Sequence, residues 1–141
     1  MARQTLKPQQ ARVLVVEDDP NNRLVLVKLL QLAGVPPGNI SQVEGDAAAY
    51  LRAQPDCRVD LILLDLQLPG KDGYTILQEL RAEPDLAGVP IIALTANVMR
   101  QDVERAQAAG FDGFIGKPID AQHFPEQIQA ILVGERVWRA V

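Results

Sequence analysis

The chain has 141 residues, of which 48% are hydrophobic, so it is long enough for one domain with a substantial core. Its net charge is −4 and its lysines and arginines are scattered singly, which argues against a nucleic-acid-binding surface. A single cysteine, Cys57, excludes an intrachain disulfide and a cysteine-based zinc site, and no apolar run approaches the roughly 18 residues that span a bilayer, so we expect a cytoplasmic protein without membrane contact.

Strand and helix patterns alternate along the chain. The strand candidates are short and almost wholly apolar, which is typical of strands buried on both faces of a sheet. The helix candidates begin near Asp or Asn capping residues, and several end near a glycine. In chain order we predict a strand at 12–16, a helix opening at 19–22 and ending near 34, a strand at 40–43, a helix at 46–54, a strand at 61–64, a helix opening at 72–73, a strand at 89–94, a helix at 97–109, a strand at 113–115 and a helix at 120–133. This alternation predicts an α/β fold, a doubly wound parallel sheet of five strands with helices on both faces.

These elements occupy residues 11–133, which we interpret as one domain. Residues 1–10 lack the apolar stretch of a signal peptide and are expected to be a flexible lead-in. Residues 134–141 are expected to be a C-terminal tail. They contain the only tryptophan, Trp138, which either anchors the tail or contacts a partner.

Polar side chains follow four of the five predicted strands, at the carboxyl ends where parallel α/β sheets bind ligands. In chain order the residues after these strands are Glu17, Asp18 and Asp19, then Asp65, then Thr95 and Asn97 with Ala96 between them, and finally Lys117. Close carboxylates repel one another by on the order of 3–4 kcal/mol per pair at an effective dielectric of about 20, and a divalent cation removes that cost. Oxygen ligands without a nearby histidine or cysteine favour Mg²⁺ over zinc.

The carboxylate of Asp65 ends the clearest strand, Leu61–Leu64. A cation and a hydroxyl, Lys117 and Thr95, opposite a metal-bound carboxylate would form a cradle for a phosphoryl group. A carboxylate can itself be the nucleophile that accepts the phosphoryl group, which gives an aspartyl phosphate. Asp65 is therefore the predicted acceptor.

Four motifs in this order resemble those of a response-regulator receiver domain of two-component signalling. They are V-V-E-D-D-P-N-N-R (Val15–Arg23), L-L-D-L-Q-L-P-G-K-D-G (Leu63–Gly73), A-L-T-A-N (Ala93–Asn97) and A-A-G-F-D-G-F-I-G-K-P-I (Ala108–Ile119). The resemblance covers nearly the whole chain. It implies a CheY-like, flavodoxin-like three-layer sandwich, here of the stand-alone single-domain type.

The resemblance also implies a role for each polar residue of the site. Asp65 is the phosphoacceptor. The implied Mg²⁺ ligands are Asp18, Glu17 through a water, Asp65 and the backbone carbonyl of Gln67. The pair Glu17-Asp18 departs from the common Asp-Asp, but the longer side chain still reaches a water-mediated metal.

On the phosphoryl side, the resemblance implies that Thr95 and Lys117 contact the phosphoryl oxygens, assisted by the backbone N–H of Ala96. Thr95 and Phe114 are the implied switch pair, with Phe where Tyr is frequent, and plain core packing is the alternative for Phe114. The bond before Pro118 is typically cis in this family.

The implied function is a phosphoacceptor receiver of a two-component phosphorelay. A partner histidine kinase or histidine phosphotransfer protein would phosphorylate Asp65, and the surface over residues 97–109, 113–115 and 120–133 would shift toward an active shape. We expect an unknown downstream protein target, no DNA-binding domain after residue 133, and a monomer or weak dimer. We expect no enzymatic activity beyond self-catalysed phosphoryl transfer and autodephosphorylation.

Four alternatives to a phosphoacceptor receiver would each leave a different mark on the sequence. A haloacid-dehalogenase-like phosphatase also uses an aspartyl nucleophile with Mg²⁺, but it would need an acid where Gln67 stands. A nucleotide- or flavin-binding module would need a glycine-rich loop after the first strand, and none is present. A degenerate receiver is disfavoured by the intact site, whereas a receiver fragment of a hybrid histidine kinase stays open. We expect no functional role for His123 or Cys57.

Overall fold

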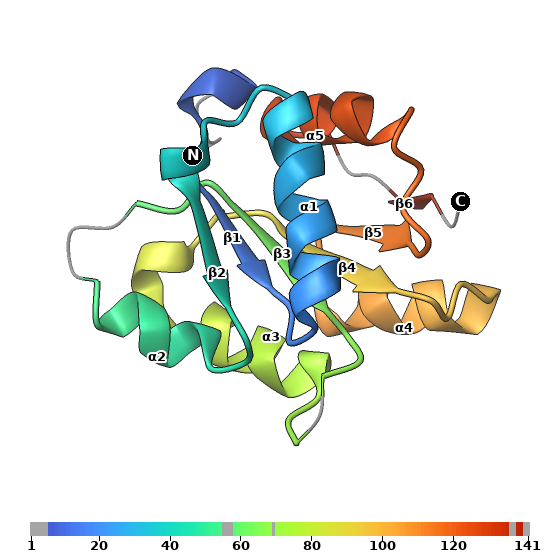
Figure 1. The fold of residues 1–141 in the computed structure, drawn as a ribbon. Helices are drawn as coiled ribbons and strands as arrows, with labels where there is room; N and C mark the ends of the chain where they lie inside the picture. Colours follow the sequence, from blue (N-terminus) through green and yellow to red (C-terminus); the bar gives the residue numbers. More distant parts are fainter. Residues whose placement is uncertain (1–5, 55–57, 69, 136–137, 140–141) are drawn as a thin grey trace.

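The computed structural model describes residues 6–54, 58–68, 70–135 and 138–139. One parallel sheet lies at the centre, in the strand order β2-β1-β3-β4-β5-β6 (Figure 1). The strands are β1 (Val13–Val16), β2 (Ile40–Val43), β3 (Leu61–Asp65), β4 (Ile91–Thr95), β5 (Gly113–Gly116) and β6 (Trp138–Arg139). The helices are α1 (Pro20–Leu32), α2 (Ala47–Arg52), α3 (Gly73–Arg81), α4 (Arg100–Ala109) and α5 (Phe124–Leu132). Within these residues, short 3-10 helices cover Pro8–Gln10, Pro37–Asn39 and Pro84–Leu86.

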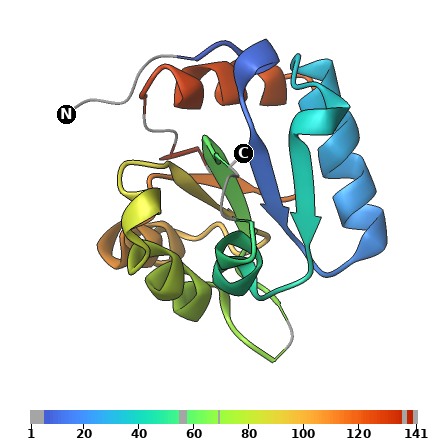
Figure 2. The same cartoon turned by 90° about the vertical axis from the view of Figure 1, so that its left-hand side faces the viewer.

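The helices cover both faces of the sheet, as Figure 2 shows from the side. Helices α1 and α5 pack with one set of strand residues, and α2, α3 and α4 pack with the alternating set. Neighbouring residues of a strand point to opposite faces, so Leu63 belongs to the first core cluster and Leu64 to the second. Because both faces are covered, β1 is wholly apolar and β3 and β4 are apolar up to their last residues, Asp65 and Thr95, which confirms the predicted doubly wound α/β fold.

Two of the predicted helix caps form as expected. The carboxylate of Asp19 accepts hydrogen bonds from the N–H groups of Asn21 and Asn22 at the start of α1. The carboxylate of Asp72 accepts one from the N–H of Thr75 at the start of α3. Gly110 ends α4 in the left-handed region, with φ of 110°. These contacts satisfy backbone groups that a helix end leaves unpaired.

Two helices begin later than the sequence predicts. Helix α4 begins at Arg100, where the carboxylate of Asp102 accepts a hydrogen bond from the N–H of Met99 at 3.2 Å, and the predicted start, Asn97, lies in the preceding loop with its N–H bonded to the Thr95 hydroxyl at 3.0 Å. Helix α5 begins at Phe124 because Asp120 first forms a turn, its carbonyl accepting from the N–H groups of His123 and Phe124.

The two chain ends also differ from expectation. The flexible lead-in expected over residues 1–10 is wrong for residues 6–10, because Pro8–Gln10 form a 3-10 helix with Pro8 buried, and the Leu6 N–H donates to the Leu132 carbonyl at 3.3 Å. In the expected tail, Trp138–Arg139 add a sixth strand parallel to β5. Without it, β5 would be an unpaired edge strand. Cys57 and the side chain of Trp138 lie outside the described part of the chain, so their expected roles stay predictions. None of the described helices is long and apolar enough to cross a membrane.

Candidate functional site

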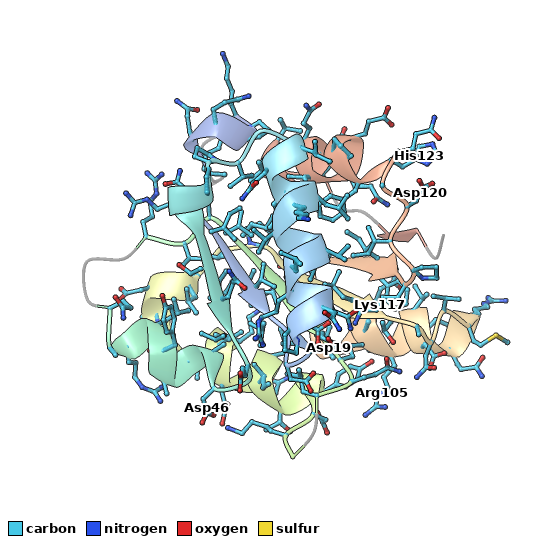
Figure 3. The ribbon with its side chains drawn as sticks, in the orientation of Figure 1. Asp19, Asp46, Arg105, Lys117, Asp120 and His123 are labelled. Atoms are coloured by element: carbon cyan, nitrogen blue, oxygen red, sulfur yellow. The ribbon has the colours of Figure 1, made fainter. Side chains whose placement is uncertain are left out.

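The carboxyl ends of the central strands bring the predicted site residues together. Glu17 and Asp18 follow β1, Asp65 is the last residue of β3, and Thr95 is the last residue of β4. Lys117 follows β5, and Figure 3 shows it at the same end of α1 as Asp19. The parallel sheet aligns these positions because all its strands run in one direction.

Three carboxylates form an acidic cluster at this edge. Glu17, Asp18 and Asp65 each place one carboxylate oxygen within 4.8 Å of the others. Glu17 is fully buried and Asp65 is 3% exposed, whereas Asp18 is partly exposed. Oxygen ligands at this spacing, with one partly open position, fit a hard divalent cation such as Mg²⁺.

The ammonium of Lys117 joins two members of the cluster. Its Nζ lies 3.0 Å from Glu17 Oε1 and 3.1 Å from Asp65 Oδ2. Burial opposes the charge of Lys117, but the hydrogen bonds and negative charges of Glu17 and Asp65 outweigh it and raise the pKa of Lys117. One lysine cannot neutralise three carboxylates, so the cluster still attracts a further cation.

The carboxyl of Glu17 has a raised pKa. Burial is the largest cause, the hydrogen bond and negative charge of Asp65 add to it, and Lys117 acts in the opposite direction. Its second oxygen, Oε2, accepts from the Asp19 N–H at 3.3 Å. The buried acid is therefore held from two sides.

Both oxygens of Asp65 are oriented by hydrogen bonds. Lys117 donates to Oδ2, and the N–H of Gln67 donates to Oδ1 at 2.9 Å. The strand that carries Asp65 is buried along its whole length. A carboxylate held in this way on a rigid strand is suited to attack at one fixed point.

The residues expected on the phosphoryl side flank Asp65. Thr95 is 1% exposed, and its carbonyl accepts from the Lys117 N–H at 2.8 Å. Ala96 and Lys117 line one hollow of about 410 Å³, whose other walls include the apolar side chains of Val25 and Ile119. The Lys117–Pro118 bond is cis, as the family resemblance implied.

Phe114 lies in the core between the sheet and α2, α3 and α4. It is fully buried, and it sits two positions before Gly116, the residue that pairs with Thr95. This position is compatible both with core packing and with a switch coupled to Thr95.

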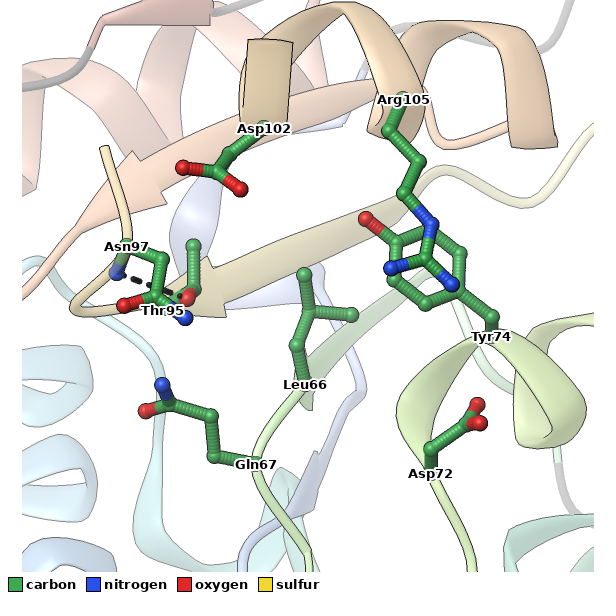
Figure 4. A pocket seen from close by; sticks show the side chains of 8 residues that line it. All are labelled: Leu66, Gln67, Asp72, Tyr74, Thr95, Asn97, Asp102 and Arg105. Carbon is green, nitrogen blue, oxygen red and sulfur yellow. Dashed lines mark hydrogen bonds between the residues drawn. The ribbon is translucent and has the colours of Figure 1, made fainter. Parts of the chain in front are cut away.

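A second cavity, of about 160 Å³, opens beside Thr95 (Figure 4). It is lined by Leu66, Gln67, Asp72, Tyr74, Thr95, Asn97, Asp102 and Arg105. The Arg105 guanidinium stacks over the Tyr74 ring at 4.1 Å, and that ring meets Phe111 edge-on at 5.8 Å between centroids. Tyr74 and Arg105 belong to none of the four motifs, so no sequence pattern indicated this stack.

Arg23 is the other residue whose contacts were missed. Its Nη1 donates to the backbone carbonyls of Glu17 at 2.9 Å and Asp18 at 3.0 Å. It stands in the motif Val15–Arg23, which marked its position but could not show which backbone atoms it contacts.

His123 lies outside the acidic cluster, at the start of α5 beside Asp120 (Figure 3). Its Nδ1 contacts an Asp120 carboxylate oxygen at 2.5 Å. This contact and the N–H of Gln122 lower the pKa of the Asp120 carboxyl. The expectation that His123 has no functional role stays a prediction.

Comparison with known proteins places this geometry among signalling domains. Residues 13–129 match the family described as the response regulator receiver domain. The transcriptional regulatory protein RprY of Bacteroides fragilis is 34% identical over 124 residues, which are 88% of this chain and 50% of RprY. The sensor protein GacS of Pseudomonas syringae pv. syringae is 33% identical over 126 residues, which are 87% of this chain and 14% of GacS.

A solved structure shows the same likeness in three dimensions. The receiver domain of the sensor histidine kinase PA1611 from Pseudomonas aeruginosa is 34% identical, with a TM-score of 0.71 over 89% of this chain and 98% of that one. It has a magnesium ion coordinated in its active site cleft. The chain spans about half the length of curated relatives such as RprY.

Proposed function

The chain belongs to the response regulator receiver domain family, and from this premise we propose that Asp65 accepts a phosphoryl group in a two-component phosphorelay. The observation that carries the proposal is the contact of Lys117 with both Asp65 and Glu17 at the carboxyl edge of the sheet. The carboxylate of Asp65 is buried, and hydrogen bonds orient both of its oxygens, as a nucleophile requires.

The phosphoryl donor is a phosphohistidine of a sensor kinase or a phosphotransfer protein. A carboxylate oxygen of Asp65 forms a bond to phosphorus, the bond from phosphorus to the histidine nitrogen breaks, and its electron pair stays on that nitrogen. Lys117, the Thr95 hydroxyl and the Ala96 N–H then hold the phosphoryl oxygens. The apolar hollow beside Lys117, which Val25 lines, gives the donor protein a surface to contact.

The acidic cluster is proposed to hold Mg²⁺ through Glu17, Asp18, Asp65 and the carbonyl of Gln67. The spacing of the three carboxylates and the magnesium in the cleft of the PA1611 receiver domain support this assignment. When bound, the ion would offset the charge of the carboxylates and of the phosphoryl group.

The output is proposed to pass through Thr95 and Phe114. In the unphosphorylated chain the Thr95 hydroxyl accepts from the Asn97 N–H in the loop before α4. A phosphoryl group on Asp65 would draw that hydroxyl toward it, release the loop and favour a second arrangement of Phe114 and the α4-β5-α5 surface. A downstream protein would then read this surface.

The family match favours a receiver over the haloacid-dehalogenase-like phosphatase. Receiver domains are generally signalling modules, and we propose no activity here beyond self-catalysed phosphoryl transfer and autodephosphorylation. We propose a cytoplasmic receiver whose domain includes residues 11–133. The matches to the sensor proteins GacS and PA1611 support a second possibility, that this receiver works within a hybrid kinase.

Incubation of the full chain with Mg²⁺ and acetyl phosphate, followed by intact mass measurement, tests the acceptor. We expect one phosphoryl group that is stable to acid and labile to base, and none in Asp65→Asn. Asp60→Asn is the matched control, because Asp60 is also buried and precedes the same strand at its other end. Labelling of Asp65→Asn at the wild-type level would contradict the proposal.

A further inference from the structure

Arg23 is a largely buried cation near the start of helix α1. It is the fourth residue of α1, where a positive charge is unfavourable because the helix dipole places partial positive charge at this end. Its side chain is only 17% exposed, so the guanidinium also loses much of its hydration. Contacts specific to this side chain must offset both costs.

The guanidinium contacts the backbone just before its own helix. A single nitrogen, Nη1, donates to the carbonyls of Glu17 and Asp18, at 2.9 Å and 3.0 Å. The same nitrogen lies 3.7 Å from a carboxylate oxygen of Glu44, in the loop between β2 and α2. Arg23 therefore joins the segment between β1 and α1 to the neighbouring loop.

The segment it holds lies beyond the regular pairing of the sheet. Strands β1 and β2 are paired through Val16 and Val43, and the last link is the Glu17 N–H, which donates to the Val43 carbonyl at 3.0 Å. After that point, the Glu17 and Asp18 carbonyls are bonded to Arg23. The direction of both carboxylates depends on the backbone angles that these two bonds restrain.

We propose that Arg23 is a positioning residue for the divalent cation site, because it restrains the backbone of Glu17 and Asp18 so that both carboxylates converge with Asp65. This inference rests on the proposed function, since it assigns a further residue to the same metal site. It predicts that loss of Arg23 weakens cation binding more than a substitution elsewhere that lowers the free energy of unfolding by the same amount.

Arg81, near the amino ends of the strands, offers a matched control. Arg81 also donates to two backbone carbonyls, those of Val89 at 3.0 Å and Gly110 at 2.9 Å, and its side chain is 28% exposed. It lies near the amino end of β4, away from the acidic cluster. Removing Arg81 therefore costs comparable backbone contacts without touching the metal ligands.

The experiment compares Mg²⁺ dissociation constants of the full-length wild type, Arg23→Met and Arg81→Met, measured by NMR titration without any phosphodonor. Denaturant unfolding of each protein gives its stability. We expect Arg23→Met to weaken Mg²⁺ binding about 10-fold or more, the lower end for residues that support metal ligands. We expect Arg81→Met to keep the wild-type Mg²⁺ dissociation constant although it loses about as much stability as Arg23→Met.

The inference would be overturned by equal Mg²⁺ dissociation constants for wild type and Arg23→Met. It would also be overturned if Arg81→Met weakened Mg²⁺ binding as much as Arg23→Met does. If Arg23→Met does not fold, Arg23→Lys and Arg81→Lys carry the same comparison, and only the former should bind Mg²⁺ more weakly. Absence of Mg²⁺ binding by the wild type would instead overturn the proposed metal site, and this inference with it.

Discussion

At the scale of single residues, the carboxylates gathered at the carboxyl ends of the strands repel one another, which lowers the stability of the fold. Glu17, Asp18 and Asp65 hold their carboxylates within 4.8 Å, and one ammonium, that of Lys117, contacts Glu17 and Asp65. Like charges at this spacing repel, and the repulsion is strongest where burial keeps water away. The cluster should therefore be more stable when one carboxylate is removed or a cation is bound.

Asp18→Asn tests this at the least buried member of the cluster. Without divalent cations, we expect the variant to be more stable than wild type by roughly 0.5–2 kcal/mol, the range typical of relieved charge repulsion. With Mg²⁺ at about 100 times its dissociation constant, wild type should gain about 2.7 kcal/mol and the variant much less. Thermal unfolding with and without Mg²⁺ measures both. A variant less stable than wild type in EDTA would show that repulsion is not the dominant effect.

At the scale of elements, the junction of β3 and α3 fixes the position of the acceptor. Gly73, the first residue of α3, lies against the backbone that follows Asp65. A Cβ at Gly73 would stand 2.7 Å from Leu66 Cδ2, 2.8 Å from Leu66 Cα and 3.0 Å from the Asp65 carbonyl oxygen. The last two are backbone atoms, so a side-chain rotation cannot relieve the contact.

Gly73→Ala should therefore move the end of β3. We expect a loss of roughly 1–3 kcal/mol of stability, as for overpacking elsewhere, together with slower labelling of Asp65 by acetyl phosphate. Gly45→Ala is the control, because a Cβ there would meet no atom within 4 Å. Urea unfolding and the initial labelling rate are the measurements. The same stability and rate in both variants would refute the idea that this close approach positions the acceptor.

For the whole molecule, one sheet is shared by two cores. Leu63 and Leu64 are neighbours on β3 and both are fully buried, yet one packs toward α1 and α5 and the other toward α2, α3 and α4. Since every inner strand contributes to both cores, neither face can lose its packing without disturbing the other. The site at the sheet edge thus depends on both cores.

We expect Leu63→Ala and Leu64→Ala each to cost about 2–5 kcal/mol, and each variant still to unfold in one transition. Calorimetry gives the check, because the calorimetric and van't Hoff enthalpies should agree for wild type and for both variants. Two separate transitions in either variant would mean that the faces unfold independently.

The sequence by itself determined the order of the first five strands and the five α-helices, because burial on two faces leaves apolar runs and helix ends leave Asp and Gly signals. It also placed Asp65 and Lys117 at strand ends, where the four motifs identify the family. Its errors fell where local signals compete: Asn97 and Asp102 both have the residue type that occurs at helix starts, and it is Asp102 whose carboxylate bonds the N–H of Met99 where α4 begins.

Only the tertiary structure decided which atoms of these distant groups are in contact. Lys117 contacts Glu17 across 100 positions of sequence, and no periodicity encodes that distance. The two carbonyls bound by Arg23, the stack of Arg105 on Tyr74, and the pairing of Trp138–Arg139 with β5 likewise emerge only from the packed chain. The physical reason is that sequence patterns record whether a side chain is buried, whereas hydrogen bonds and stacking depend on relative positions that packing alone establishes.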